Sequence, residues 1–251
     1  MKKVLSSIFE VYKQYRAFRK QNTPYKILRY SLTTIVVAYF LTIAFPQYLF
    51  AHEVSHKNFK VYSTQPVDEK LYQILDSAEG RLVKSPIYDG ELKHKVFLTG
   101  SHAFYGFLSN KAYKSFANSI PGLDNILINK TDIGEDLVFL NRAERNKRSL
   151  SGVVAHEVTH LLIKKKFGYL NTVVTIPTWK NEGYCEYVAG DSTVTYEEGV
   201  QLLKENPTQD SYFKYHLMVK YLLETEKLSI EELFNRDLDE KEVEAKVLAS
   251  L

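Results

Sequence analysis

Hydrophobic residues along the chain are spaced in ways that predict both helices and strands. A helix is predicted where apolar residues follow a period of about 3.6, at Val67, Leu71, Ile74, Leu75, Ala78 and Leu82. Strands are predicted where short apolar runs are bounded by Gly, Asp and Asn, at Val96–Leu98, Asn125–Ile128 and Leu137–Leu140. The first half of the chain therefore combines both kinds of element.

The second half is predicted to be helical. Residues 150–166 contain no proline and carry a broad apolar band, with Ser149 or Ser151 as the N-cap and Gly168 beyond the end. Another helix is predicted to open near Trp179. Capping boxes and a long apolar run mark further helices, at Thr195–Glu198, Ser229–Glu232 and residues 212–223. We expect an α+β domain with a mixed N-terminal lobe and a helical C-terminal lobe.

An apolar stretch over residues 30–51 carries no formal charge and is long enough to cross a bilayer. It lacks the small residues that precede a signal-peptide cleavage point, so we interpret it as an uncleaved anchor. Basic residues are concentrated before it, at Lys2, Lys3, Lys13, Arg16, Arg19, Lys20, Lys26 and Arg29. The positive-inside rule then predicts a cytoplasmic tail (1–29), a transmembrane helix in the cell membrane (30–51), a polar linker (52–66) and an extracytoplasmic domain (67–251).

The basic tail also carries apolar residues at helical spacing, among them Ile8, Phe9 and Tyr12. A helix lying on an anionic membrane surface explains this pattern, and so does a solvated tail whose charges serve only topology. The net charge of +3 is concentrated in this tail, so it says little about the domain's partners. The basic residues match no nucleic-acid-binding module, and we expect no nucleic-acid partner.

The most specific chemistry lies in His156-Glu157-Val158-Thr159-His160, inside the predicted helix over residues 150–166. Residues four apart share a helix face, so both imidazoles can bind one metal ion beside the Glu157 carboxylate. Glu182, in the next predicted helix, is available as a third ligand, and two histidines with a glutamate form a known catalytic zinc set. The alternative is a core helix that contains two histidines by chance, and Glu182 disfavours it.

Together with the run Thr178-Trp179-Lys180-Asn181-Glu182-Gly183-Tyr184-Cys185-Glu186-Tyr187, this motif resembles the gluzincins, the thermolysin-like branch of the zincin metallopeptidases. The compact membrane-linked bacterial members are the most similar, and the resemblance covers roughly residues 124–233. It implies a zincin-like domain in which a small mixed sheet packs on the active-site helix and an edge strand lines the cleft. It also implies zinc bound by His156, His160 and Glu182, with Glu157 as general base.

The resemblance extends to supporting residues. Glu186 stands where the family often has an acidic residue that supports a ligand histidine, although thermolysin-type proteins carry the shorter aspartate there. Asn181 matches the Asn that often precedes the ligand glutamate. A later helix of the family brings a tyrosine to the cleft, which makes Tyr212 the first candidate to stabilise an oxyanion and His216 the second. Cys185 is expected to be a small buried residue of the active-site helix.

These expectations describe a membrane-anchored zinc metallopeptidase that hydrolyses a peptide or protein substrate with Zn²⁺ as its cofactor and an activated water as the nucleophile. The lipid bilayer, contacted through residues 30–51, is the other expected partner. A different interpretation keeps the fold and the metal without turnover. The protein would then be a catalytically silent or gated membrane protein that binds or senses a partner.

Overall fold

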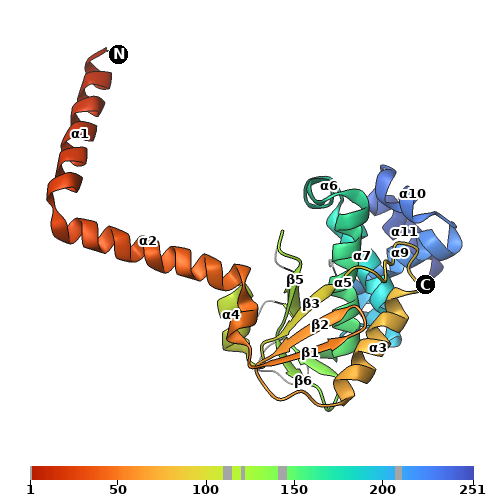
Figure 1. The fold of residues 1–251 in the computed structure, drawn as a ribbon. Coiled ribbons are helices and arrows are strands. Elements are labelled where there is room, and N and C mark those ends of the chain that lie inside the picture. Colours follow the sequence, from red (N-terminus) through yellow and green to blue (C-terminus); the bar gives the residue numbers. More distant parts are fainter. Residues whose placement is uncertain (1, 110–114, 120–121, 141–145, 207–210) are drawn as a thin grey trace. The chain divides into compact units, whose positions relative to one another are not determined.

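The computed structural model describes residues 2–109, 115–119, 122–140, 146–206 and 211–251. The chain divides into two compact units, Met1–Tyr48 and Leu49–Leu251. In the larger unit, strands and helices alternate in the N-terminal part and helices follow in the C-terminal part (Figure 1). The predicted α+β class is therefore confirmed.

The smaller unit consists of two helices, α1 (Lys2–Gln21) and α2 (Thr23–Ala44). The Asn22 side chain accepts a hydrogen bond from the Tyr25 backbone N–H and so caps the start of α2. α2 is long and apolar enough to cross a membrane. Its bounds differ from the predicted 30–51, because the cap starts the helix earlier and Pro46 stops it, after which the chain continues as the 3₁₀ helix η1 (Pro46–Leu49).

The larger unit is built on a five-stranded mixed sheet in the order β1-β2-β3-β5-β4. The central three strands are parallel, and both outer strands are antiparallel to their neighbours. The strands span His52–His56 (β1), Phe59–Ser63 (β2), His94–Leu98 (β3), Ala117–Ser119 (β4) and Asn125–Ile128 (β5). The sheet thus has two edges, β1 and β4.

The segment over residues 52–66 differs from the predicted polar linker, because it contains β1 and β2. Phe59 and Val61 of β2 are buried in the core, whereas β1 alternates between exposed and half-buried residues. β1 reads as polar because it is an edge strand with one solvated side. β2 pairs in parallel with β3, which comes much later in the chain. Nothing in the sequence near β2 predicts that pairing.

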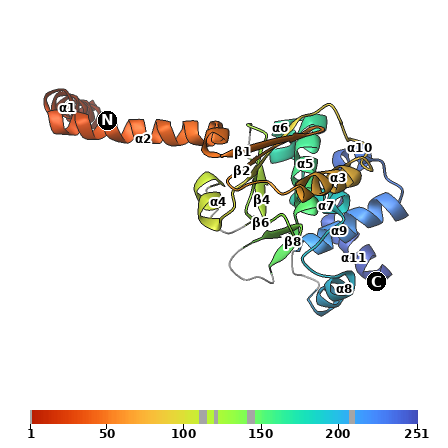
Figure 2. The same ribbon diagram turned by 60° about the horizontal axis from the view of Figure 1, so that its bottom comes forward.

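Helices cover both faces of the sheet. Phe97 and Leu127 point to the face covered by α4 (His102–Ser109), where they join Tyr105 in a small cluster. The alternate residues of the strands, such as Val96 and Ile126, point to the opposite face, which carries α3 (Lys70–Leu82) and α5 (Leu150–Phe167) (Figures 1 and 2). The helix predicted from the 67–82 pattern is confirmed as α3.

A second, three-stranded antiparallel sheet leads into α5. It consists of β6 (Lys130–Asp132), β7 (Leu137–Phe139) and β8 (Lys147–Ser149), in that order. Strands were predicted at β3, β5 and β7 and are confirmed there. The strands β4, β6 and β8, each three residues long, lack an apolar run, and the sequence does not predict them.

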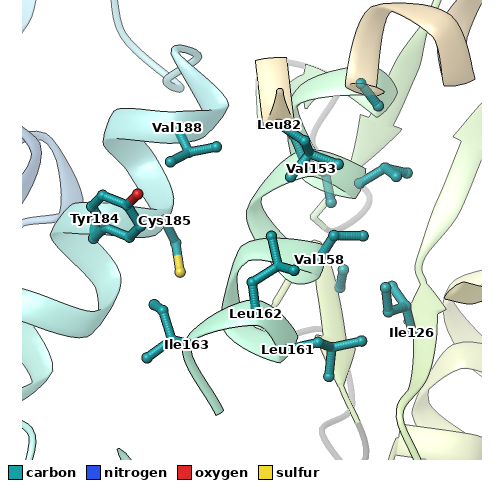
Figure 3. Packing of buried hydrophobic residues seen from close by; sticks show 14 of the residues in the cluster. Leu82, Ile126, Val153, Val158, Leu161, Leu162, Ile163, Tyr184, Cys185 and Val188 are labelled. Atoms are coloured by element: carbon teal, nitrogen blue, oxygen red, sulfur yellow. The ribbon is translucent and has the colours of Figure 1, made fainter. Parts of the chain in front are cut away.

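Helix α5 lies at the centre of the core. All of its residues from Leu150 to Ile163 are buried, and it packs between the large sheet and α7 (Thr178–Ala189). Figure 3 shows this arrangement, with Val158 and Leu161 on α5 facing Ile126 of β5 and the residues of α7 on the other side. Because α5 is enclosed on most sides, its polar residues occupy a costly position and require partners.

The remaining helices complete the C-terminal lobe, and α9 and α11 lie on the side of α7 away from the sheet (Figure 2). They span Tyr169–Val174 (α6), Tyr196–Glu205 (α8), Tyr212–Lys220 (α9), Tyr221–Thr225 (the π-helical η2), Ile230–Asn235 (α10) and Glu240–Ser250 (α11). The capping boxes predicted at Thr195 and Ser229 are both present. α7 and α9 approach closely at Gly183, where a Cβ would come within 2.5 Å of the Tyr215 carbonyl oxygen.

Candidate metal centre

The start of α5 is held by two carboxylates from distant loops. Ser149 is the N-cap, and its Oγ accepts a hydrogen bond from the Gly152 N–H. Asp191 Oδ2 accepts hydrogen bonds from the Ser149 N–H and Oγ–H, and Asp136 accepts the corresponding pair from Ser151. Gly152 leaves room for this cap, because a Cβ there would lie 2.6 Å from Asp191 Oδ2. These hydrogen bonds therefore fix the residue at which α5 begins.

One helical turn apart on α5, the imidazoles of His156 and His160 converge with the Glu182 carboxylate of α7. Glu182 Oε2 lies 3.3 Å from His156 Nε2 and 3.5 Å from His160 Nε2. Both histidines are buried, with ring centroids 4.9 Å apart. The structure therefore brings the three predicted ligands together and turns one nitrogen of each ring toward the same carboxylate oxygen.

The other nitrogen of each ring has a partner of its own. His156 Nδ1 lies 3.0 Å from Glu186 Oε1, an ion-pair distance without hydrogen-bond alignment. His160 Nδ1 lies 3.3 Å from Asn181 Oδ1. Both predicted supporting residues thus contact the histidine nitrogen that faces away from Glu182, and the longer glutamate at position 186 spans the distance. Such contacts orient an imidazole and leave Nε2 free to bind a metal.

Cys185 offers a second way to complete a metal site. His156, His160 and Cys185 form a buried group whose ligand atoms lie close enough together to hold a metal ion. The Cys185 sulfur, however, lies 3.2 Å from Nδ1 of His160, the nitrogen that faces away from Glu182. Burial and the Glu182 carboxylate raise the pKa of the thiol well above its usual value, which disfavours the thiolate that binds metals. Glu182, in contrast, faces Nε2 of both rings.

The electrostatic field of the site favours a cation. Burial by itself lowers the pKa of His156, but the carboxylates of Glu186, Glu182 and Glu157 outweigh it and raise the pKa to about 10. Burial raises the pKa of Glu186, yet the charges of His156 and Arg148 bring it down to about 2. A nitrogen-and-carboxylate donor set that already attracts positive charge fits a divalent metal ion.

Arg148 of β8 supports this site and was not predicted. Its guanidinium donates two hydrogen bonds to the Glu186 carboxylate, at 2.7 and 3.0 Å, and a third to the Asp191 backbone oxygen at 2.8 Å. Arg148 is 7% exposed and Glu186 is 2% exposed. A basic residue just before a capped helix is an ordinary sequence feature, so no local signal could have identified it as the partner of a residue on α7.

A cavity of about 640 Å³ opens onto the metal centre and is lined by residues of β4, β8, α5, α7, α8 and α9. Glu157 lines it beside the histidines, as a candidate base must. The edge strand that lines the cavity is β4, through Ala117, Asn118 and Ser119, and it is none of the three strands that the sequence predicts.

Of the two predicted oxyanion donors, the structure brings only Tyr212 to this cavity. The Tyr212 ring lies 6.3 Å from the His156 ring. Burial, Glu182 and Glu186 raise the pKa of Tyr212, so its hydroxyl keeps its proton and can donate a hydrogen bond. His216 instead contacts the backbone of Glu186 and the Tyr187 ring, 6.2 Å away. It does not line the cavity, because its side chain lies against α7.

Comparisons with known proteins identify no relative, since no protein-family model matches the chain and a search of curated proteins gives no match. The geometry of this site is therefore what indicates a function. The side chains of His156, His160, Glu182, Glu157 and Tyr212 open onto one cavity beside the edge strand β4. This arrangement can bind a metal ion and hold an extended chain next to it.

Proposed function

We propose that the protein is a zinc-dependent metallopeptidase with a zincin-like catalytic domain of the gluzincin type. The observation that carries the proposal is the convergence of His156 Nε2, His160 Nε2 and Glu182 Oε2 beside Glu157 in an open cavity. His156, His160 and Glu182 would hold Zn²⁺. When bound there, Zn²⁺ supplies a Lewis acid that polarises the scissile carbonyl and lowers the pKa of water.

The chain's own groups account for the proton transfers. The Glu157 carboxylate takes a proton from the attacking water as the water oxygen bonds to the carbonyl carbon. It then delivers that proton to the nitrogen of the leaving amine as the C–N bond breaks. The Tyr212 hydroxyl donates a hydrogen bond to the carbonyl oxygen as negative charge develops on it.

An extended peptide would bind along β4. This strand pairs with β5 on one side, and no strand among the described residues pairs with its other side, which lies beside the cavity. A substrate that adds a strand there would run past the metal centre with its backbone held in register. We expect a peptide or protein substrate for this reason.

We also propose that α2 anchors the enzyme in the cell membrane with the N-terminus in the cytoplasm. The basic residues of the N-terminal segment precede α2 or lie in its first turns, and the positive-inside rule places them on the cytoplasmic side. The catalytic domain would then be extracytoplasmic. Protease treatment of intact cells tests this orientation, because an epitope at the N-terminus should be protected and one at the C-terminus should be digested.

The test of the catalytic proposal compares Glu157→Gln with the unchanged protein, both full-length in detergent. We expect the variant to bind zinc in the same stoichiometry, measured by mass spectrometry, while hydrolysis of a peptide library falls by roughly 10²–10⁴-fold. Glu135→Gln, at an exposed turn position, is the matched control and should keep full activity. Undiminished hydrolysis by Glu157→Gln would refute the assigned base, and zinc binding without hydrolysis by the unchanged protein would favour the silent binding or sensing protein.

A further inference from the structure

Lys164 extends the ligand-bearing face of α5 by one turn. It follows His160 by the same interval by which His160 follows His156, so the three side chains lie along one side of the helix. Lys164 Nζ donates a hydrogen bond to Ser119 Oγ at 3.1 Å, and Ser119 is the last residue of the edge strand β4. Both residues line the cavity. The ammonium group therefore lies between the metal-binding face of α5 and the strand edge.

This ammonium group has no carboxylate partner among the residues that the structure describes. The other basic residue of the cavity wall, Arg148, is bound in bidentate fashion by Glu186. The acidic residues of the wall are gathered around the histidines, at Glu157, Glu182 and Glu186. Within the described part of the chain, Lys164 is thus a cation without an acidic partner at one part of the cavity.

The next two lysines along the chain are used differently. Lys165 pairs with Asp89, and Lys166 pairs with Glu231. Neither lines the cavity. All three lysines lie in the last turn of α5, where positive charge complements the helix dipole. The dipole therefore explains the group of lysines, but it does not explain why only Lys164 faces the cavity without an acidic partner.

We propose that Lys164 selects substrates with a carboxylate close to the cleaved bond, either an Asp or Glu side chain or a free C-terminal carboxylate. The inference rests on the proposed peptidase function and names the substrate class of the same site. Four residues of helix rise by about 6 Å, and an extended peptide advances about 3.3 Å per residue. The carboxylate that pairs with Lys164 therefore belongs within about two residues of the bond that is hydrolysed.

Recognition would combine two donors. Lys164 Nζ supplies a charged hydrogen bond to the carboxylate, and the Ser119 hydroxyl can turn from Lys164 to supply a second. Such a bond to a charged group typically changes affinity by roughly 10–100-fold. Because the group lies beside the strand edge, the same peptide can pair its backbone with β4 and its carboxylate with Lys164.

The experiment measures cleavage preference with the full-length, zinc-loaded protein in detergent. Cleavage sites in a proteome-derived peptide library are identified by mass spectrometry. Four synthetic versions of one cleaved peptide then separate the two sources of the carboxylate, with Glu or Gln beside the bond and with a free or amidated C-terminus. Lys164→Met removes the charge, Lys164→Gln keeps a donor for Ser119, and Lys164→Glu reverses the charge. Lys165→Met combined with Lys166→Met is the control.

We expect the unchanged protein to prefer one carboxylate-bearing version over its amide, and Lys164→Met and Lys164→Gln to abolish that preference by lowering kcat/KM for the carboxylate version about 10–100-fold. The amide versions should be cleaved as before, and Lys164→Glu should prefer a basic residue. A role confined to helix stability would instead lower all rates together and would be shared by the Lys165 and Lys166 control. Cleavage with no carboxylate preference, or a preference that survives Lys164→Met, overturns this inference alone. Absence of cleavage by the zinc-loaded protein overturns the proposed function and this inference with it.

Discussion

Two buried histidines of the same domain respond to burial in opposite ways. His94, at the start of β3, is fully buried, and neither of its ring nitrogens has a hydrogen-bond partner among the described residues. Burial lowers its pKa to about 4. His156, on α5, is 6% exposed, yet surrounding carboxylates raise its pKa to about 10. Burial without partners excludes the charged imidazolium, whereas burial among carboxylates retains it.

His94 is a packed core residue, whereas His156 lies in a site that favours positive charge. His94 packs against the Phe59 ring, with centroids 5.6 Å apart, and contributes shape to the core. His156 instead lies between two glutamates of α7, of which Glu182 also contacts His160 and Glu186 also binds Arg148. The positive charge on His156 balances carboxylates that a bound metal ion would otherwise neutralise. The two regions should therefore respond differently to mutation, to pH and to zinc.

The largest effect on stability is expected from breaking the charge balance around His156. Arg148→Met leaves the Glu186 carboxylate buried with only His156 to balance it. Removing one partner of a buried ion pair costs about 3–5 kcal/mol of unfolding free energy. Urea unfolding of the full-length protein in detergent measures this loss. The matched control is Arg236→Met, whose pair with Glu232 is exposed, and it should cost less than about 1 kcal/mol.

Equal losses in Arg148→Met and Arg236→Met would show that the network around His156 is not a buried charge balance. Zinc should also reveal the difference. Because the proposed zinc site requires the histidines and Glu182 in place, added zinc should stabilise the Arg236 variant as much as the unchanged protein and the Arg148 variant less.

The pH dependence of stability is the next largest effect, and it tests the role of His94. Unfolded His94 titrates near 6.5, but the folded protein does not protonate it until about pH 4. Its contribution to stability is therefore complete above pH 6.5 and is lost as the pH falls toward 4, by about 3 kcal/mol across that window. His94→Leu should flatten the unfolding free energy between pH 6.5 and 4 relative to the unchanged protein.

His94→Gln provides the control for packing, because it keeps a buried polar group that does not titrate. A packing defect shifts the whole stability curve, whereas loss of the titrating group changes its slope. Both variants should therefore show the same reduced slope, even if their stability at neutral pH differs. An unchanged slope in both would mean that His94 is not the group that resists protonation.

The cluster of His156, His160 and Glu182 could be predicted from sequence because its information is local. His156 and His160 are set by helical periodicity, and Glu182 by its place in the next helix. Glu186 and Asn181 followed from a family resemblance, and the structure places both against histidine Nδ1 atoms. Local periodicity also predicted α3, α5 and the capping boxes, because each depends on residues close together in the chain.

The parts that were not predicted depend on contacts between distant segments. Arg148 meets Glu186 only because β8 and α7 pack against the same end of α5. The sequence predicts a linker where β2 lies, because the partner strand β3 follows only after a whole helix. His216 follows Tyr212 by one helical turn, but α9 packs closely on α7, and His216 contacts Tyr187 of α7 and does not line the cavity.

The smallest expected effects come from the groups that hold the two ligand rings, and they refine what sets His156 apart. Loss of a group that orients a metal-binding histidine typically lowers metal affinity by roughly 10–100-fold. Glu186→Gln should lie near the upper end of that range, because it removes a buried charge that no other side chain replaces at His156 Nδ1. Asn181→Ala should lie near the lower end, because the Cys185 sulfur remains 3.2 Å from His160 Nδ1.

Competition with a chelator of known affinity measures both values, and their order is the prediction. Asn181→Ala combined with Cys185→Ala removes both contacts of His160 Nδ1 and should weaken zinc binding more than Asn181→Ala alone. If Asn181→Ala weakened binding as much as Glu186→Gln, the two rings would be held equally. The carboxylate at His156 would then matter for orienting the ring and not for the positive charge that distinguishes this histidine from His94.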